Sequence, residues 1–435
     1  MAEVKPFRGV RYNESLVQEM SAVICPPYDV ITPQLQEELY NRSTYNFIRL
    51  EHGRKLPQDS TVDNKYTRSA SIIEEWLRKK VLITEEKPCI YLHDHHFLHM
   101  GRQYKRRCLI ARIKLEDWHK NVIRPHEGTL VEPKNDRISL LWALGANTSP
   151  ILAMFEDDKR YVSSLIDTQE LGKPIVNIES YDTEAHRLWK ISGDSIIKKL
   201  SGFFADKSLY IADGHHRYES SLIYQREQRA INAGAPEDAV FNYTLMSLVD
   251  FDDPGLLILP PHRLIRGMAP SKLEGLGEKL IAFFDIEELP LNLPDIWDRI
   301  DRLLADERDI RLFLFGLNDE SLFLLTLRDF AAAEKMMPYF HSPLYKRLDV
   351  SIVDHVILEE LLGLSSEDEV KISYNYDHRD TVKQVQKREH QLAFIISPIN
   401  SRKIKDISDA GDRMPRKSTY FYPKMPSGLV LNRLV

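Results

Sequence analysis

The chain has 435 residues, 29% of them charged and 43% hydrophobic, and a formal net charge of −6. This is enough sequence for two or three soluble domains with sizeable cores, and the mild acidity argues against a protein that coats nucleic acid. No apolar run approaches the roughly 18–20 residues of a membrane span, no signal-peptide apolar region is present, and three cysteines without metal-ligand spacing favour a reduced, cytoplasmic protein.

Near the N-terminus, an apolar strand runs into a Pro-Pro pair, which forces an extended, rigid turn. This turn presents Tyr28 and Asp29 at a strand end, where both could contact a ligand. Asp29 could also cap the helix predicted over Thr32–Asn41, and the two interpretations are compatible. The same part of the chain predicts a strand at Asn46–Leu50 and an amphipathic helix at Tyr66–Lys80.

A β-hairpin is predicted from Cys89–Met100 and Cys108–Leu115, with its turn at a Gly-Arg pair. Its first strand carries four histidines, three of which point to one face because side chains alternate along a strand. No cysteine lies among them, so a structural or solvent-facing role is favoured over a zinc site. The four are His93, His95 and His99 on one face and His96 on the other.

The segment from Arg124 to Glu127 reads Arg-Pro-His-Glu, and its proline prevents regular structure. Loops with clustered ionisable groups often hold catalytic residues. Glu127 beside His126 could act as a general base, and Arg124 could bind an anion. A surface turn with ordinary salt bridges explains the same residues equally well.

The densest chemistry lies at the end of the apolar strand Leu209–Ala212, where Asp-Gly-His-His-Arg leads into a helix predicted over Tyr218–Arg229. A helix N-terminus attracts anions, glycine lets the main chain approach a ligand, and arginine can hold a phosphate through two hydrogen bonds. The alternative is a helix start that Asp213 caps among solvated polar residues. The functional interpretation, which we favour, assigns phosphate binding to Gly214, His215, His216 and Arg217.

The rest of the chain predicts a smaller, mainly structural α/β domain over residues 266–435, after a catalytic region over residues 1–265. Its expected elements are a helix at Glu278–Asp285, a hairpin from Leu312–Gly316 and Leu322–Leu327, a helix at Val350–Leu364, and a β-α-β unit from Val370–Tyr374, Thr381–Arg388 and Leu392–Ile396.

The C-terminal tail is irregular, basic and aromatic, and we expect it to be anchored in the fold and to return to the catalytic site. Lys417, Ser418, Thr419 and Lys424 would make a reasonable set of phosphate or nucleotide contacts. A nucleic-acid patch is the other interpretation, because basic residues alternate with aromatic ones. The acidic chain disfavours that reading.

Several of these segments together resemble the bacterial and archaeal family called domain of unknown function 1015, over nearly the whole chain. One small departure is Ser220, where the family usually has threonine after the Tyr-Glu of the central motif. The segments are Cys25-Pro-Pro-Tyr-Asp-Val, Arg124-Pro-His-Glu, Ala212-Asp-Gly-His-His-Arg-Tyr-Glu, Pro261-His262-Arg263 and Lys417-Ser-Thr-Tyr-Phe-Tyr-Pro-Lys.

The central motif also resembles the phosphate-binding loop of the ParB and sulfiredoxin superfamily, in which a free serine kinase uses such a loop for nucleotide phosphates and a glutamate for the serine hydroxyl. The resemblance implies a mixed α/β fold with a ParB/sulfiredoxin-like core and an ATP-dependent kinase of free L-serine. Its cofactors would be ATP or ADP and Mg²⁺. A ParB-like nucleotide-binding regulator or nucleotidase is the alternative, because fold analogy does not determine the reaction.

The kinase interpretation assigns each candidate residue a role. Glu127 would be the catalytic base, with His126 beside it, and Asp213 would bind the metal or position the phosphates. Arg124 would bind the serine carboxylate, and Asp29, next to Tyr28, would bind the serine amino group.

Overall fold

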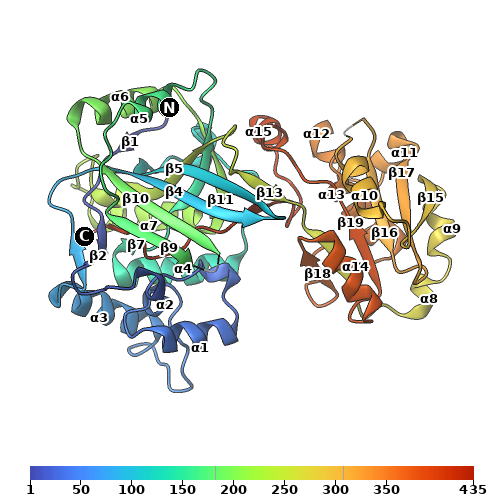
Figure 1. The fold of residues 1–435 in the computed structure, drawn as a ribbon, viewed down its shortest axis with the longest axis horizontal. Helices are drawn as coiled ribbons and strands as arrows, with labels where there is room; N and C mark the ends of the chain where they lie inside the picture. The colour runs from blue at the N-terminus through green and yellow to red at the C-terminus, as the bar shows by residue number, and fades with distance from the viewer. Residues whose placement is uncertain (182, 307) are drawn as a thin grey trace. The chain divides into compact units, whose positions relative to one another are not determined.

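The computed structural model describes residues 1–181, 183–306 and 308–435, which divide into two compact units (Figure 1). Both units combine helices with β-sheets, which confirms the predicted mixed α/β class. None of the described helices has the length and apolar character that crossing a bilayer would require. The first unit comprises Met1–Pro125, Thr129–Leu257 and Pro423–Val435, and the second comprises His126–Gly128 and Ile258–Tyr422.

A large mixed sheet forms the centre of the first unit, with the strand order β6-β11-β8-β12-β5-β4-β10-β9 and β1 paired to β5. Strands β4 and β5 are the predicted hairpin, and Met100 and Gly101 form its turn with φ of 48° and 76°. The strands are β1 (Val4–Lys5), β4 (Ile90–His99), β5 (Arg102–Lys114), β6 (Ile123–Arg124), β8 (Ile151–Phe155), β9 (Val176–Tyr181), β10 (Glu184–Ile191), β11 (Leu209–Asp213) and β12 (Tyr243–Asp250).

This sheet is buried on both faces. Along β4, Tyr91 joins one hydrophobic cluster, whereas Ile90 and Leu92 join another, as the alternation of side chains along a strand requires. Two short ribbons complete the strands of this unit. They pair β2 (Val10–Tyr12) with β3 (Leu82–Thr84), and β7 (Ala146–Asn147) with β21 (Asn432–Arg433).

Helices supply the remainder of both clusters. Ile73 and Trp76 of α3 join the cluster of Tyr91, and Leu200 of α6 and Leu222 of α7 join the cluster of Ile90. The helices and short 3-10 turns of this unit are η1 (Met20–Ala22), η2 (Tyr28–Val30), α1 (Pro33–Arg42), α2 (Ile48–Glu51), α3 (Lys65–Arg78), η3 (Trp118–Lys120), α4 (Val131–Leu144), α5 (Tyr161–Asp167), α6 (Asp194–Phe204), α7 (His215–Ile231) and η4 (Val240–Asn242).

The strand predicted at Asn46–Leu50 was wrong, because these residues lead into the short helix α2. The Asn46 side chain accepts the Ile48 N–H at 3.0 Å and donates to the Ala22 carbonyl at 2.8 Å. This local bond turns the backbone out of the extended conformation. A buried asparagine with tertiary partners therefore overrides the apolar pattern of the segment.

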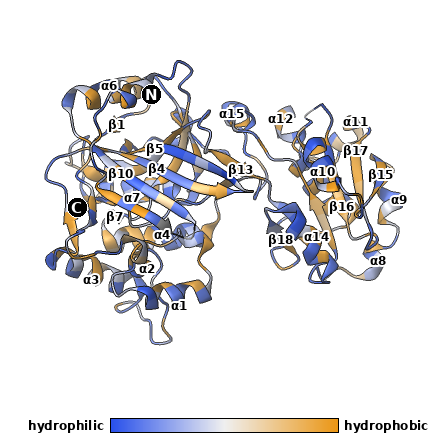
Figure 2. Ribbon diagram, in the orientation of Figure 1, coloured by the Kyte–Doolittle hydropathy of each residue, from blue (hydrophilic) through white to orange (hydrophobic). Residues whose placement is uncertain are grey.

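The second unit is built on a sheet with the order β15-β17-β16-β19-β14-β18. The predicted hairpin of β16 and β17 and the predicted β18-α14-β19 unit are confirmed, and Figure 2 shows the hydrophobic character of β16 and β17. The strands are β14 (His262–Ile265), β15 (Phe284–Pro290), β16 (Arg311–Phe315), β17 (Ser321–Leu327), β18 (Ile372–Asn375) and β19 (Leu392–Ile395). The chain enters this unit within β13 (Leu257–Leu259) and leaves it after β20 (Tyr420–Tyr422).

The helix predicted at Glu278–Asp285 was wrong in its second half. Helix α9 ends at Leu280, and Phe284 already pairs with Leu327 in the sheet. The helix predicted at Val350–Leu364 is confirmed as α13 followed by the π-helix η5. The helices are α8 (Pro270–Leu273), α9 (Leu276–Leu280), α10 (Ile296–Leu304), α11 (Phe330–Glu334), α12 (Pro343–Lys346), α13 (Asp349–Ser351), η5 (Ile352–Leu361), α14 (His378–Gln386) and α15 (Ser401–Asp409).

Candidate functional site

The centre of the candidate site is the turn between β11 and α7. Strand β11 is buried up to Ala212 and ends at Asp213, and α7 begins at His215 and continues for 17 residues. Gly214 between them has a φ of 100°, which glycine adopts without strain. Gly214, the residue before the helix, has no side chain with which to cap the first turn of α7. Its backbone N–H groups and the positive end of its dipole favour an anion here.

Four charged side chains meet at this turn, and we call them the Asp213 cluster: Asp29, Asp213, Arg217 and Lys424. One oxygen of Asp213 accepts a hydrogen bond from Arg217 Nη2 at 2.5 Å, and the other accepts one from Lys424 Nζ. Lys424 Nζ also lies 3.4 Å from Asp29 Oδ2. Burial opposes ionisation of Asp213, but Lys424 and Arg217 outweigh it and hold the pKa of this carboxyl well below its usual range. Asp213 is therefore ionised at neutral pH.

Arg217 is held at both arms of its guanidinium. Nη1 donates to the Pro150 carbonyl at 2.5 Å, while Nη2 donates to Asp213. A Cβ atom added to Gly214 would lie 2.8 Å from Arg217 Nε, which is closer than atoms normally approach. Gly214 is thus required both by its backbone conformation and by the position of Arg217.

The two histidines of the motif pack against the protein. His215 is buried, and His216 Nε2 accepts the backbone N–H of Leu130 at 2.8 Å. Glu219, one turn further along α7, pairs with Lys134 at 3.2 Å and accepts a hydrogen bond from Thr129. These contacts fix the start of α4 against α7. The role of both histidines in phosphate binding stays a prediction.

Tyr28 contacts Arg137, which forms a buried ion pair with Glu51 that the sequence did not reveal. The Arg137 guanidinium stacks on the Tyr28 ring at 4.0 Å from its centroid, and Arg137 Nη1 lies 3.2 Å from the fully buried Glu51. Burial raises the pKa of Tyr28 to about 12, so its hydroxyl stays protonated. Arg137 and Arg217 also line a common cavity of about 30 Å³. No short motif marks this pair, because Glu51 and Arg137 are 86 positions apart in sequence.

Arg124 lies beside the same strand but nearer its start. It is paired with Tyr210 in the parallel ladder of β6 and β11, and its Nη1 donates to the Tyr210 hydroxyl at 3.3 Å. Its Nε donates to the Asn121 carbonyl at 3.0 Å. Its predicted role in binding a carboxylate is not tested by these contacts.

The predicted base belongs to the second unit, where it meets the tail. Glu127 Oε1 accepts the Thr419 hydroxyl at 3.2 Å, and the same hydroxyl lies 3.1 Å from Nε2 of the fully buried His126. His126 Nε2 is 3.9 Å from Glu127 Oε1. The structure thus brings together His126, Glu127 and Thr419, which the sequence had singled out in two separate motifs.

The neighbours of Thr419 in the tail form a turn. Ser418 is buried, and its hydroxyl donates to the Pro415 carbonyl at 2.6 Å. Lys417 has a φ of 54°. In this arrangement the Ser418 hydroxyl holds the turn, and contacts of Lys417 and Ser418 with a phosphate stay predictions.

The histidines of the β4–β5 hairpin form a separate buried group in the first unit. His93 and His95 are fully buried, so the solvent-facing part of the earlier interpretation was wrong for these two. His186 of β10 lies directly opposite His95 in the sheet, which a reading of one strand alone could not anticipate.

The family model described as protein of unknown function (DUF1015) matches residues 4–351, and no curated protein matches. Similar solved structures include a mutant free serine kinase in complex with ADP, which is 13% identical with a TM-score of 0.34, and the match covers 74% of this chain and 92% of that one.

Two further structures are similar at the same level. A conserved hypothetical protein from Pyrococcus furiosus is 14% identical with a TM-score of 0.34, over 75% of this chain and 95% of that one. SbnI with a C-terminal truncation, from Staphylococcus aureus, is 10% identical with a TM-score of 0.33, and the match covers 73% of this chain and 85% of that one. Values this low assign no activity to the chain. The family match spans well over half of its residues, and the chain therefore belongs to the DUF1015 family.

Proposed function

We propose that the protein is a small-molecule phosphotransferase that uses ATP to phosphorylate free L-serine, giving O-phosphoserine and ADP. The observation that carries the proposal is the convergence of Arg217 and Lys424 on Asp213 at the start of α7. Two cations beside the N-terminus of a long helix suit a polyphosphate ligand. The sequence resemblance to the free serine kinase loop supports the same choice of ligand.

The nucleotide phosphates would bind to the backbone of the turn and to the two cations. Gly214 lets the main chain approach the phosphates, and the planar guanidinium of Arg217 matches two phosphate oxygens. Lys424 supplies a point charge. Asp213 keeps both cations in place before the nucleotide binds, so the binding energy is not spent on ordering two long side chains.

Magnesium would enter with the nucleotide, where it neutralises charge on the phosphate oxygens. Asp213 remains a candidate ligand, although both of its oxygens already accept hydrogen bonds from cations. Asp213 could therefore bind a metal only if Lys424 released its oxygen and paired with another group, such as Asp29. Asp29, whose side chain is 37% exposed, is the more accessible carboxylate of the cluster.

In the proposed reaction the serine hydroxyl oxygen attacks the γ-phosphorus, and the bond from that phosphorus to the β-phosphate oxygen breaks, so that ADP leaves. Glu127 would accept the hydroxyl proton, with His126 beside it. We assign the serine amino group to Asp29, next to Tyr28, and the serine carboxylate to Arg124, because a guanidinium group matches the geometry of a carboxylate.

The test is to incubate the purified protein with ATP, magnesium and a panel of free amino acids, and to detect phosphorylated products by mass spectrometry. O-phosphoserine formed only with serine supports the proposal. Arg217→Ala should then abolish product formation, whereas the matched surface change Arg226→Ala, on the same helix, should not. ADP formed at equal rates without any amino acid would favour a nucleotidase or nucleotide-dependent regulator. No turnover of nucleotide would refute both.

A further inference from the structure

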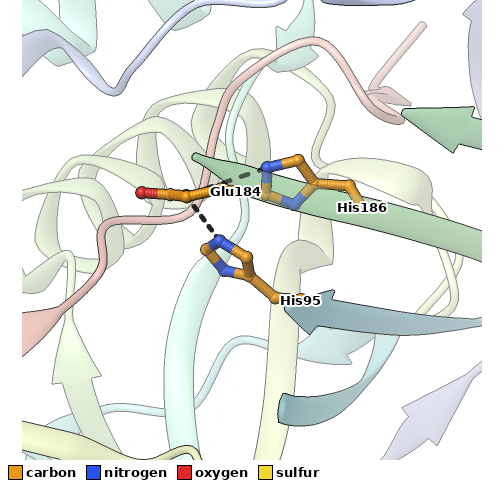
Figure 3. A group of neighbouring side chains, drawn as sticks. All are labelled: His95, Glu184 and His186. Atoms are coloured by element: carbon orange, nitrogen blue, oxygen red, sulfur yellow. Dashed lines mark hydrogen bonds and ion pairs between the residues drawn. The ribbon is translucent and has the colours of Figure 1, made fainter. Parts of the chain in front are cut away.

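We propose that His95, Glu184 and His186 bind one divalent transition-metal ion of the zinc class (Figure 3). Each residue offers one ligand atom, and these atoms all lie within 4.8 Å of one another. The site belongs to the sheet of the first unit and shares no residue with the Asp213 cluster. It does not depend on the proposed kinase activity.

The pairing of two strands builds this group. His95 of β4 and His186 of β10 are direct partners in an antiparallel ladder, so their side chains project from the same face. Glu184 is two residues before His186 on β10, at an irregularity in the pairing with β9. In Figure 3, dashed lines join Glu184 to both imidazole rings. Two segments about 90 residues apart thus present their side chains to one point.

The ligand chemistry suits such an ion. His95 Nε2 lies 2.5 Å from Glu184 Oε2, and His186 Nε2 lies 3.9 Å from the same oxygen. The imidazole nitrogen of histidine, in its neutral form, is among the commonest metal ligands in proteins. Two imidazoles and one carboxylate are a common ligand set for zinc and related ions.

A neighbouring residue supports the orientation of one ligand. His93 Nε2 lies 3.2 Å from His186 Nδ1, and His93 is fully buried. A hydrogen bond from the other ring nitrogen is what usually orients a metal-binding histidine. With His186 Nδ1–H donating to His93, the lone pair of His186 Nε2 faces Glu184.

Arg106 competes with the ion for His95. Its Nη2 lies 3.1 Å from His95 Nδ1 and also donates to the Pro423 carbonyl at 2.9 Å. A guanidinium only donates, so the proton of His95 is on Nε2 and points to Glu184 in the metal-free protein. Metal binding places the ion where that proton was and moves the proton of His95 to Nδ1. Arg106 then keeps Pro423 as its acceptor and gives up His95.

Glu184 is the most accessible of the three residues, since 18% of its side chain is exposed whereas the side chains of His95 and His186 are fully buried. Glu184 lines a cavity of about 420 Å³ together with residues of the β4–β5 hairpin, among them Tyr104 and Lys105. Three protein ligands leave a coordination position for water or a small ligand, as in catalytic rather than structural zinc sites.

The test uses tag-free, full-length protein stripped of metal with a chelator. Titration with ZnCl₂ by calorimetry should show one saturable site, and CoCl₂ should give the visible absorption of a low-symmetry site. His186→Gln and Glu184→Gln should weaken zinc binding at least tenfold. His99→Gln, on the same strand but outside the group, should leave it unchanged, and Arg106→Gln should strengthen it because the competing donor is removed.

Circular dichroism and thermal unfolding of the metal-free variants establish that they fold. Absence of saturable zinc binding overturns the proposal, and so does equal weakening by His99→Gln and His186→Gln. If His186→Gln does not fold, X-ray absorption of the zinc-loaded wild-type protein decides: two imidazole ligands support the site, and fewer overturn it.

Discussion

Replacing Asp213 by asparagine tests whether the candidate site is built on this carboxylate. The change preserves the size of the side chain and removes the charge that holds Arg217 and Lys424. Removing one partner of a fully buried ion pair costs about 3–5 kcal/mol, because the other charge stays buried without compensation. The side chains of Asp213, Arg217 and Lys424 are 19%, 13% and 13% exposed, so solvent reduces this cost. We expect a loss of about 2–3 kcal/mol.

Thermal unfolding followed by circular dichroism measures this loss. A domain of this size loses about 2–4 °C in Tm per kcal/mol, so Asp213→Asn should lower the Tm of the first unit by about 5–10 °C. Asp117→Asn is the matched control, since Asp117 pairs with Arg226 on the surface with side chains 41% and 65% exposed. It should cost less than about 1 kcal/mol. Equal shifts in the two variants would refute the reasoning.

The pH dependence gives a second readout of the same carboxylate. Its pKa is lowered in the folded protein, so its stabilising contribution is fully present above the ordinary value of about 4 and is lost as the pH falls toward the folded-state pKa. The difference in Tm between the wild-type protein and Asp213→Asn should therefore be constant from pH 7 to about 5 and shrink below about pH 4. A difference that grows on acidification would contradict the assigned charge state.

Four further outcomes are expected. Glu127→Gln should reduce the rate of phosphotransfer by about 10²–10⁴-fold with little change in nucleotide affinity, and an unchanged rate would exclude Glu127 as the base. Lys424→Met should raise the nucleotide KM about tenfold or more, because a charged hydrogen bond worth about 1.5–3 kcal/mol is lost, whereas an unaltered KM would exclude it from the nucleotide site. Gly214→Ala should destabilise the first unit by about 1–2 kcal/mol in urea unfolding, since its φ is 100° and the new Cβ meets Arg217. Burial lowers the pKa of His262 to about 3, so the second unit should lose stability as the pH falls from about 6.5, by up to about 1.4 kcal/mol per pH unit, and His262→Gln should flatten this dependence.

The sequence alone was sufficient wherever the signals are local. The turn at Gly214 was predicted because an apolar run, a glycine and a helix-forming stretch follow one another directly in the sequence. The hairpin of β4 and β5 follows from two alternating strands around a glycine turn, and the hairpin of β16 and β17 was found in the same way. In each case the elements that pair or follow one another are neighbours in the chain, so their pattern carries the geometry.

Only the tertiary structure decided which distant residues meet. Lys424 reaches Asp213 across 211 positions, and Thr419 reaches Glu127 across 292. The buried pair of Glu51 and Arg137 has the same character. A sequence pattern shows which side chains are buried. Which of them become partners depends on how segments far apart in the chain pack together, and the local pattern holds no information about that packing.

The histidines of β4 show this difference within a single element. The alternation of the strand correctly placed His93 and His95 on one face. This face meets His186 and Glu184 because β10 is the next strand in the sheet. The burial of the face depends on the same strand order. The local alternation comes from the geometry of one backbone, whereas the partner strand is selected by the folding of the whole unit, because strand order depends on how all the strands and helices share one core.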